Sequence, residues 1–300
     1  MNPIFIGSGV ALVTPFDKDG QINYLRFKEL IEFQIANKTD AIVVCGTTGE
    51  SSTLSVKERM TLFEKAVETV NGRVPVICGT GSNSTSFSLD FAKEAEKLNI
   101  DAHLSVTPYY NKTSQAGLIR HYFNLADNLE KPIIVYNVPS RTGMNITSET
   151  YKKLSEHENI KAVKEADPNI TKLIKSIVLC KDKLDFYIGN DDLISVAASL
   201  GCKGVISVMA NILPSYTHNM VTAGISGNCV KCSEMQKDVM DFIECLFMQV
   251  NPIVVKELMN RCGFDVGECR LPLTNADYIY NDIIETVIKQ YSELILAENK

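Results

Sequence analysis

Residues 41–79 contain two short apolar runs, Ala41-Ile-Val-Val-Cys-Gly-Thr47 and Val74-Pro-Val-Ile-Cys-Gly79, separated by a longer amphipathic stretch. Near-continuous apolar runs rich in β-branched residues are typical of parallel strands that are covered on both faces. The stretch between them opens with Ser55-Val-Lys-Glu58, a capping box that marks the start of a helix. This region therefore predicts one strand–helix–strand unit.

The same alternation continues on both sides of this unit. Six further runs are predicted to be strands, at residues 10–15, 102–107, 132–137, 160–164, 184–189 and 204–208. Helix patterns follow the eight runs, at residues 23–37, 55–70, 84–98, 114–129, 147–157, 169–179, 191–200 and 214–223. Eight alternations predict an α/β fold, a (β/α)8 TIM barrel over residues 1–225. A doubly wound open sheet is the main alternative, but Gly79-Thr-Gly81 is only a fragment of the phosphate loop that such a sheet usually carries.

The alternation of apolar runs and amphipathic stretches ends after residue 225. Residues 229–248, 252–261 and 275–298 are long amphipathic patterns without intervening strands. They predict a C-terminal helical domain over residues 226–300, with three helices that pack on the barrel or support contacts between subunits.

The bulk composition excludes several classes of protein. The 300 residues are 45% hydrophobic and 22% charged, which is usual for a soluble globular protein. The formal charge of −6 argues against general nucleic-acid binding. No apolar run approaches the ~20 residues that span a bilayer, and the N-terminal residues lack the pattern of a signal peptide. We therefore expect a cytoplasmic protein without membrane or nucleic-acid partners.

The cysteines and histidines do not favour a metal site. The nine cysteines are scattered, and several lie in apolar patterns that suit reduced, buried thiols. Cys229-Val-Lys-Cys232 has the spacing of a zinc-binding pair, but its conceivable partners, Cys262 and Cys269, lack matching spacing. The four histidines lie far apart, so we expect neither a structural nor a catalytic metal.

In TIM barrels the active site forms at the carboxyl ends of the strands, and Lys164 lies at the end of one of them. Burial lowers the pKa of a lysine, and a neutral amine can attack a ketone to form a Schiff base. Tyr136, at the end of the preceding strand, could move the protons that this reaction needs. The alternative is that Lys164 simply extends from a strand end towards water.

Other strand ends also carry polar groups, and the sequence allows two different roles for each of them. Gly46-Thr-Thr-Gly-Glu-Ser51 could present hydroxyl and N–H groups to a small carboxylate, or could form an ordinary strand-to-helix turn. Thr107-Pro-Tyr-Tyr-Asn111 could form an aromatic wall or an interface contact. Arg141 could bind a carboxylate with two hydrogen bonds, or could be a surface residue.

These residues give the chain a family resemblance. It resembles the dihydrodipicolinate synthase / N-acetylneuraminate lyase family of class I, Schiff-base-forming aldolases, over residues 5–295. The resemblance rests on four motifs in the right order at successive barrel positions: Gly46-Thr-Thr-Gly-Glu50, Thr107-Pro-Tyr-Tyr-Asn111, Tyr136-Asn-Val-Pro-Ser-Arg-Thr-Gly143 and Val163-Lys-Glu-Ala166.

The resemblance implies roles for four catalytic residues. Lys164 would form the Schiff base with pyruvate, and Tyr136 would be the acid and base beside it. Thr48 would link Tyr136 to Tyr110, and the resemblance implies that this second tyrosine comes from the neighbouring subunit of a homotetramer built as a dimer of dimers.

The resemblance also implies how the substrates bind. Thr47 and Thr48 would hold the carboxylate of pyruvate, and Arg141 would bind the carboxylate of L-aspartate 4-semialdehyde. The backbone at Gly189 and Ile206 would line the site. No metal or organic cofactor would be needed, because the covalent pyruvate imine on Lys164 activates the substrate.

The implied reaction is the condensation of pyruvate with L-aspartate 4-semialdehyde to 4-hydroxy-tetrahydrodipicolinate, in lysine and diaminopimelate biosynthesis. The main alternative is a sister pyruvate aldolase or lyase acting on a sugar acid or a hydroxy-oxo acid. Thr47-Thr48 and Ser140-Arg-Thr142 favour the synthase. A barrel that only binds a small acid is an alternative of another class, which the intact catalytic residues disfavour.

Many members of this family are inhibited by lysine at a cleft between subunits. Ser51, Asn83 and Tyr109 match that cleft. Val56 and Arg59 stand where lysine-sensitive members tend to carry histidines, and Phe87 stands where they carry a glutamate. A missing carboxylate and an added arginine disfavour a cationic ligand, so the sequence predicts weak or absent inhibition by lysine.

Overall fold

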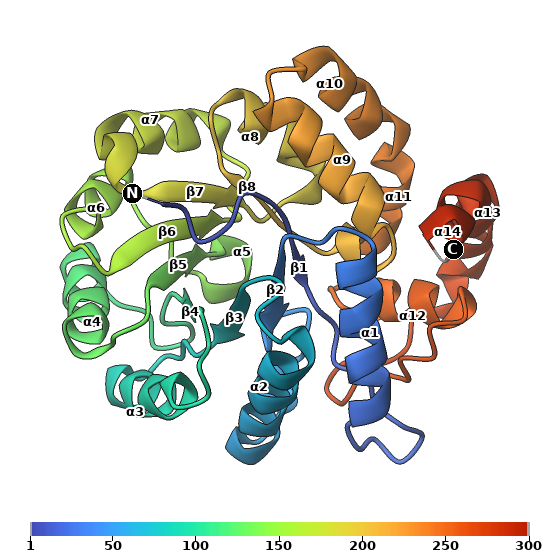
Figure 1. Cartoon of the computed structure of the whole chain (residues 1–300), viewed down its shortest axis with the longest axis horizontal. Helices are drawn as coiled ribbons and strands as arrows, with labels where there is room; N and C mark the ends of the chain where they lie inside the picture. Colours follow the sequence, from blue (N-terminus) through green and yellow to red (C-terminus); the bar gives the residue numbers. More distant parts are fainter. Residues whose placement is uncertain (1, 299–300) are drawn as a thin grey trace.

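Eight parallel strands close into one barrel in the computed structural model, which describes residues 2–298 (Figure 1). Each strand pairs with its neighbours in sequence, and the first strand closes the barrel against the eighth. The predicted TIM barrel is therefore confirmed. The strands are β1 (Gly7–Ala11), β2 (Ala41–Val44), β3 (Val76–Gly79), β4 (Ala102–Val106), β5 (Ile133–Asn137), β6 (Ile160–Glu165), β7 (Asp185–Ile188) and β8 (Gly204–Ser207).

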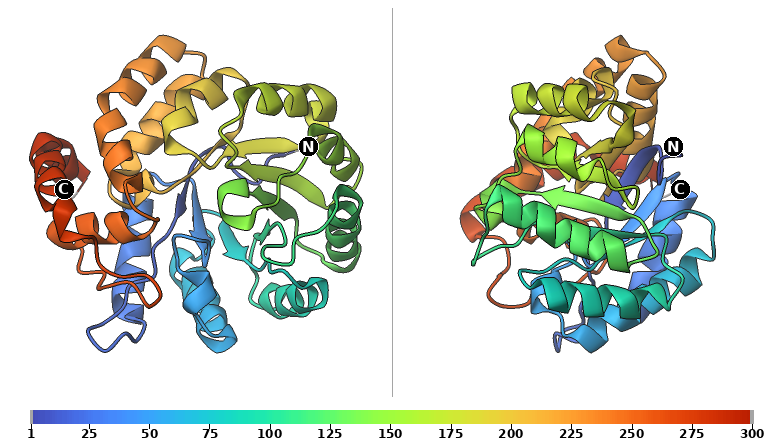
Figure 2. Two further views of the ribbon diagram at one scale, coloured as in Figure 1. Left: turned by 180° about the vertical axis from the view of Figure 1, so that it is seen from behind. Right: turned by 90° about the vertical axis from the view of Figure 1, so that its left-hand side faces the viewer.

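An outer ring of helices surrounds the barrel (Figure 2). The capping box predicted at Ser55 and Glu58 is present at the start of α2. A one-turn helix, α5 (Pro139–Thr142), was not predicted, and it carries Arg141 directly after β5. The other helices of the ring are α1 (Tyr24–Ala36), α2 (Val56–Val70), α3 (Thr85–Glu96), α4 (Gln115–Asn128), α6 (Ser148–Leu154), α7 (Ile170–Cys180), α8 (Ile194–Ser199) and α9 (Pro214–Ile225).

Strand β1 begins and ends three to four residues earlier than residues 10–15, where the apolar pattern places it. Past Ala11 the side chain of Asn211 takes the place of a ladder partner. Its Nδ2 donates to Ala11 O at 2.9 Å, and its Oδ1 accepts from Val13 N at 3.1 Å. The chain therefore leaves the sheet there, although Leu12 and Val13 are as buried as strand residues.

The C-terminal part of the chain is helical, but it contains more helices than the three predicted. Within the described residues it forms α10 (Cys229–Asp238), α11 (Met240–Phe247), α12 (Ile253–Arg261), α13 (Asn281–Gln290) and α14 (Ser292–Glu298), which lie along one side of the barrel (Figure 1). The extra breaks fall at Val239 and Tyr291, which have non-helical backbone angles and are buried. A single buried apolar residue does not interrupt an amphipathic pattern, so the sequence could not show these breaks.

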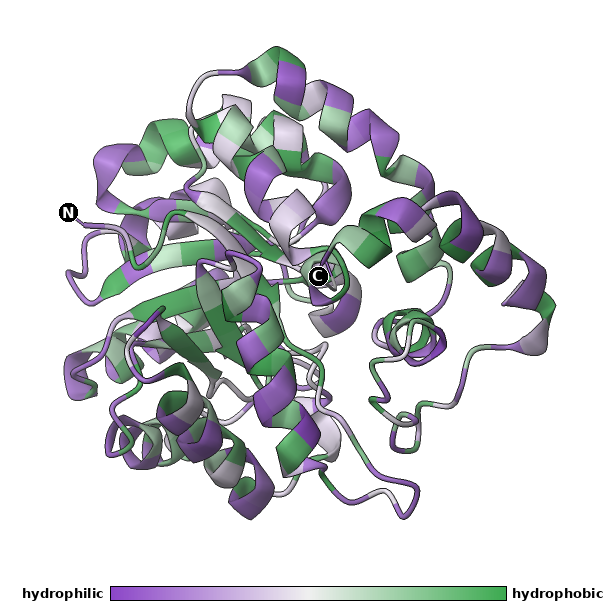
Figure 3. Ribbon diagram, turned by 45° about the vertical axis from the view of Figure 1, so that its right-hand side comes forward, coloured by the Kyte–Doolittle hydropathy of each residue, from purple (hydrophilic) through white to green (hydrophobic). Residues whose placement is uncertain are grey.

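Apolar side chains fill the barrel below its mouth. The strands are coloured largely as hydrophobic in the ribbon of Figure 3. Phe5 closes the opposite end, where its ring stacks on that of Tyr187 with the centroids 4.2 Å apart. The Tyr187 hydroxyl donates to Phe5 O at 2.7 Å. No helix within residues 2–298 is long and apolar enough to cross a membrane.

Candidate active site

Lys164 and Tyr136 lie side by side at the carboxyl end of the barrel. They are register partners on β6 and β5, and each side chain is only 6% exposed. The Lys164 Nζ lies 4.5 Å from the centroid of the Tyr136 ring. The structure thus brings together the amine and the phenol that the sequence places at the ends of neighbouring strands, and proton transfer by Tyr136 stays a prediction.

The two side chains open into a cavity of about 390 Å³. Gly189 leaves room for the lysine, because a Cβ at this position would lie 3.0 Å from Lys164 Cε. The cavity wall combines residues at or just after the ends of β2, β5, β6, β7 and β8 with residues of the C-terminal part of the chain: Thr47, Thr48, Tyr136, Val138, Ser140, Arg141, Lys164, Ala166, Gly189, Asn190, Asp192, Val208, Met240, Ile243, Glu244, Phe247 and Asn251.

Thr47 and Thr48 belong to a tight turn after β2, residues 46–50, which we call the threonine loop. Glu50 N donates to Thr47 O at 3.1 Å and closes the turn. The Thr14 hydroxyl donates to Gly49 O at 2.7 Å and holds the turn against the segment that follows β1. A small carboxylate in the cavity would therefore meet hydroxyl groups on a fixed backbone.

Asn251 was not predicted, yet it connects two of the predicted residues. Its Nδ2 donates to Thr48 Oγ1 at 3.0 Å, and its backbone O accepts from Arg141 Nη2 at 2.9 Å. Asn251 is 6% exposed, and its Oδ1 has no hydrogen-bond partner among the described residues. The Asn251-Pro252 dipeptide is typical of a turn, but nothing in the sequence places this turn at the barrel mouth.

Two predicted site residues lie away from the cavity. Tyr110 is 92% exposed, with a positive φ of 69°, and within residues 2–298 no hydrogen bond joins it or Tyr136 to Thr48. Ile206 is fully buried in the barrel interior and does not line the cavity. Val208, the first residue after β8, lines the cavity in its place.

Asp191 is a buried carboxyl group near Lys164 that the sequence analysis missed. Its Oδ2 accepts from the backbone N–H groups of Val208 and Met209, at 3.0 and 2.8 Å. Burial raises the pKa of Asp191 above its usual value, whereas hydrogen bonds and the charge of Lys164 lower it. The group ties the chain just before α8 to the turn just after β8.

A second cavity, of about 260 Å³, adjoins the first and contains part of the predicted lysine cleft. Ser51, Tyr109 and Arg59 line it, but Asn83 does not. Arg59 is 8% exposed, donates to Gly79 O at 2.5 Å and lies 4.1 Å from the centroid of the Phe91 ring. Burial lowers the pKa of the Arg59 guanidinium below its usual value.

Within the described part of the chain, no group of three or more His, Cys, Asp or Glu side chains is arranged to hold a metal ion. Of the cysteines considered as a zinc site, Cys229 is exposed, Cys232 is buried, and Cys262 and Cys269 are half-buried free thiols. The functional groups that line the cavity include an amine, a phenol, hydroxyl groups, a guanidinium and the carboxyl groups of Asp192 and Glu244.

A sequence model of the Dihydrodipicolinate synthetase family matches residues 4–291. The chain belongs to this family. It is 48% identical over 288 residues to 4-hydroxy-tetrahydrodipicolinate synthase 1 of Clostridium acetobutylicum, covering 96% of this chain and 98% of that protein. It is 47% identical over 289 residues to the 4-hydroxy-tetrahydrodipicolinate synthase of Acetivibrio thermocellus, with the same two coverages.

A solved member of the family shows that the fold is shared. The chloride-inhibited dihydrodipicolinate synthase of Acinetobacter baumannii, crystallised with pyruvate, matches with a TM-score of 0.94 and 36% identity. The match covers 96% of this chain and 99% of that chain. The barrel and the C-terminal helices that form the cavity wall thus belong to one architecture that the family has in common.

Proposed function

We propose that the protein is a 4-hydroxy-tetrahydrodipicolinate synthase, which condenses pyruvate with L-aspartate 4-semialdehyde through a Schiff base on Lys164. One observation carries the proposal: Lys164 is buried beside Tyr136 at the mouth of the barrel, in a cavity where Gly189 leaves room for the lysine side chain. The names of the curated relatives support the choice of substrates.

The reaction begins when the Lys164 amine attacks the ketone carbon of pyruvate. Tyr136 supplies the proton with which the ketone oxygen leaves as water, and an iminium remains. The iminium withdraws electrons, so the methyl group loses a proton and an enamine forms. The enamine carbon then attacks the aldehyde of the second substrate, and the new alkoxide takes a proton.

Ring closure releases the enzyme. The amine of the aspartate semialdehyde attacks the imine carbon, and the Lys164 nitrogen leaves as the amine, so that one water is lost over the whole reaction. Thr47 and Thr48 hold the pyruvate carboxylate during these steps, and Arg141 holds the carboxylate of the second substrate.

The test is a coupled assay with both substrates, run beside borohydride trapping with pyruvate alone. Lys164→Ala should lose turnover and trapping together, whereas Lys152→Ala, at an exposed position of α6, should keep both. Trapping on Lys164 without turnover of aspartate semialdehyde would move the assignment to a sister aldolase. Absence of a trapped pyruvate adduct in the unsubstituted protein would overturn the Schiff-base mechanism.

We also propose that Tyr110 completes the site of a neighbouring subunit, in a dimer or in a tetramer built from two dimers. Its exposure at the loop edge supports this, as does its absence from the cavity of its own chain. Subunits with Lys164→Ala and subunits with Tyr110→Ala should each be nearly inactive. Refolded together in equal amounts, they should recover about a quarter of the activity, because half of the dimers then contain one complete site. No recovery would contradict a shared site.

A further inference from the structure

The threonine loop is held from behind by a buried ion pair that the proposed mechanism does not use. Lys256, on α12, and Glu50, the last residue of the loop, have side chains that are 2% and 0% exposed. The Lys256 Nζ lies 2.9 Å from Glu50 Oε1. A buried charge is costly unless it is fully paired, so this arrangement needs an explanation in either stability or function.

All the donors of Lys256 are used. Besides Glu50, its Nζ donates to Thr14 O at 3.2 Å and to Glu268 O at 2.7 Å. It also lies 4.3 Å from the centroid of the Phe16 ring. Burial lowers the pKa of Lys256, and the charge of Glu50 opposes this shift. One ammonium group therefore joins the segment after β1, the threonine loop and the C-terminal segment.

Glu50 needs this support because its backbone is strained. It has a φ of 53°, in the left-handed region that a residue with a Cβ seldom adopts. Its second oxygen, Oε2, accepts from Arg270 N at 2.9 Å. Both carboxylate oxygens are thus bound by the C-terminal segment, which fixes the side chain and with it the direction of the turn that carries Thr47 and Thr48.

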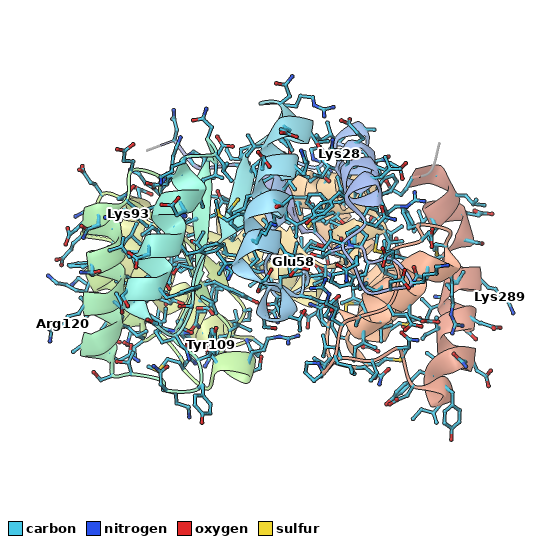
Figure 4. The ribbon with its side chains drawn as sticks, turned by 90° about the horizontal axis from the view of Figure 1, so that it is seen from below. Lys28, Glu58, Lys93, Tyr109, Arg120 and Lys289 are labelled. Carbon is cyan, nitrogen blue, oxygen red and sulfur yellow. The ribbon has the colours of Figure 1, made fainter. Side chains whose placement is uncertain are left out.

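Arg270 adds further contacts between the C-terminal segment and the residues that flank the threonine loop. Its guanidinium donates to Gly20 O, to Thr53 O and to Glu58 Oε1, the last at 2.6 Å. This interaction lowers the pKa of Glu58 to about 2. Figure 4 shows Glu58 between the helices of the barrel and the C-terminal segment. Residues 256–270 therefore bind the segment before the threonine loop, at Thr14 and Gly20, and the segment after it, at Thr53 and Glu58.

The same C-terminal segment also reaches the loop from the cavity side. Asn251, which precedes α12, donates to Thr48 Oγ1 at 3.0 Å. The loop is consequently bound at Thr48, on the side of the cavity, and at Glu50, on the buried side. Both contacts come from residues 251–256.

We propose that Lys256 is a positioning residue for pyruvate: by binding Glu50 it holds the threonine loop in the conformation that presents Thr47 and Thr48 to the pyruvate carboxylate. This inference rests on the proposed function. Lys256 itself does not line the cavity and touches no reacting atom. Its loss should therefore weaken the binding of pyruvate while leaving the chemistry of Lys164 intact.

The experiment measures how the rate of borohydride trapping on Lys164 depends on the pyruvate concentration. Lys256→Met removes the ammonium and keeps an unbranched side chain. The double variant Glu50→Gln/Lys256→Met also removes the uncompensated buried carboxylate, so it should regain thermal stability. Glu96→Gln is the matched control, because the His103–Glu96 pair is also poorly exposed but ties α3 to β4, which the cavity does not include.

We expect Lys256→Met to raise the pyruvate concentration at half-maximal trapping about tenfold, with a saturated rate within about threefold of the unsubstituted protein. The double variant should be more stable than Lys256→Met. It should still need more pyruvate for half-maximal trapping than the unsubstituted protein, since neither new side chain carries the charge that holds the loop. If Lys256→Met does not fold, the pyruvate dependence of trapping in the double variant alone tests the inference. A normal pyruvate dependence in the folded variant, or an equal change in Glu96→Gln, would overturn the inference. Absence of trapping in the unsubstituted protein would instead refute the proposed function.

Discussion

Asn137 donates a hydrogen bond to Glu165 across the β5–β6 ladder, with Asn137 Nδ2 and Glu165 Oε1 2.7 Å apart. The two residues are register partners one position after the Tyr136–Lys164 pair. Because side chains alternate along a strand, this bonded pair faces the helices directly behind the pair that faces the cavity. The hydrogen bond between Asn137 and Glu165, on the outer face of the barrel, thus stabilises the register of β5 and β6 that places Lys164 beside Tyr136.

Glu165→Ala should destabilise the protein strongly. Glu165 also accepts from the Tyr151 hydroxyl at 2.8 Å and from Lys172 Nζ at 3.2 Å, and it is 1% exposed. Its removal leaves the buried Tyr151 hydroxyl without an acceptor, and it takes one of the acceptors of Asn137 and of Lys172, which keep their bonds to Asn145. The free energy of unfolding should therefore fall by about 3 kcal/mol. Urea unfolding measures this loss. Glu149→Ala, which breaks an exposed pair with Lys175, should cost less than about 1 kcal/mol, and similar losses for the two variants would contradict the argument.

Gly189→Ala should impair imine formation more than folding. The added Cβ would lie 3.0 Å from Lys164 Cε and 3.0 Å from Ala166 Cβ, so the lysine stem must move. We expect the rate of pyruvate trapping on Lys164 to fall about tenfold or more, since small displacements of a nucleophile are costly. Gly72→Ala, outside the cavity lining, is the control, because an added Cβ there would meet no atom within 4 Å and trapping should not change. Unchanged trapping in Gly189→Ala would show that the lysine has room to spare.

The sequence predicted the barrel and the inward pair because both depend on local patterns. Each strand is a short apolar run, and Lys164 and Tyr136 stand where two such runs end. The contributions of Asn251 and Lys256 could not be predicted in this way. Asn251 lies in the turn before α12 and Lys256 lies on α12, far along the chain, and only the packing of the C-terminal helices brings them to Thr48 and Glu50.

The stability of the protein should fall on mild acidification because of His121. This residue on α4 is 5% exposed, and burial lowers its pKa from 6.5 to about 4. The unfolded chain takes up a proton near pH 6.5, whereas the folded chain does so only near pH 4. The stabilisation is therefore complete above pH 6.5, and about 3 kcal/mol of it is lost as the pH falls to 4. Denaturant unfolding across this range should show the slope.

The variant His121→Asn tests this assignment, since an amide can keep the hydrogen bond with Thr85 Oγ1, which lies 2.8 Å from His121 Nδ1. It removes the titrating group, so the change in unfolding free energy between pH 6.5 and 4 should become smaller by about 3 kcal/mol. An unaltered slope would mean that other groups cause the acid sensitivity.

Arg141→Lys should affect the second substrate alone. Arg141 lies on the cavity wall, and one of its terminal nitrogens, Nη2, donates to Asn251 O, which leaves its other donors available to a carboxylate. A lysine cannot form two parallel hydrogen bonds with a carboxylate, so KM for aspartate semialdehyde should rise about tenfold. The pyruvate dependence of trapping should stay within about twofold. Arg120→Lys, on the exposed face of α4 (Figure 4), should change neither value.

Lysine should inhibit this enzyme weakly or not at all. The cavity that contains Ser51 and Tyr109 is lined by two arginines, Arg59 and Arg141, and none of the described residues on its wall is acidic. The ammonium groups of lysine would therefore enter a positively charged space without a counter-ion. Initial rates at rising lysine concentration measure the effect. Half-inhibition below about 1 mM, a binding free energy of about −4 kcal/mol, would show that another subunit or a rearrangement supplies the missing negative charge.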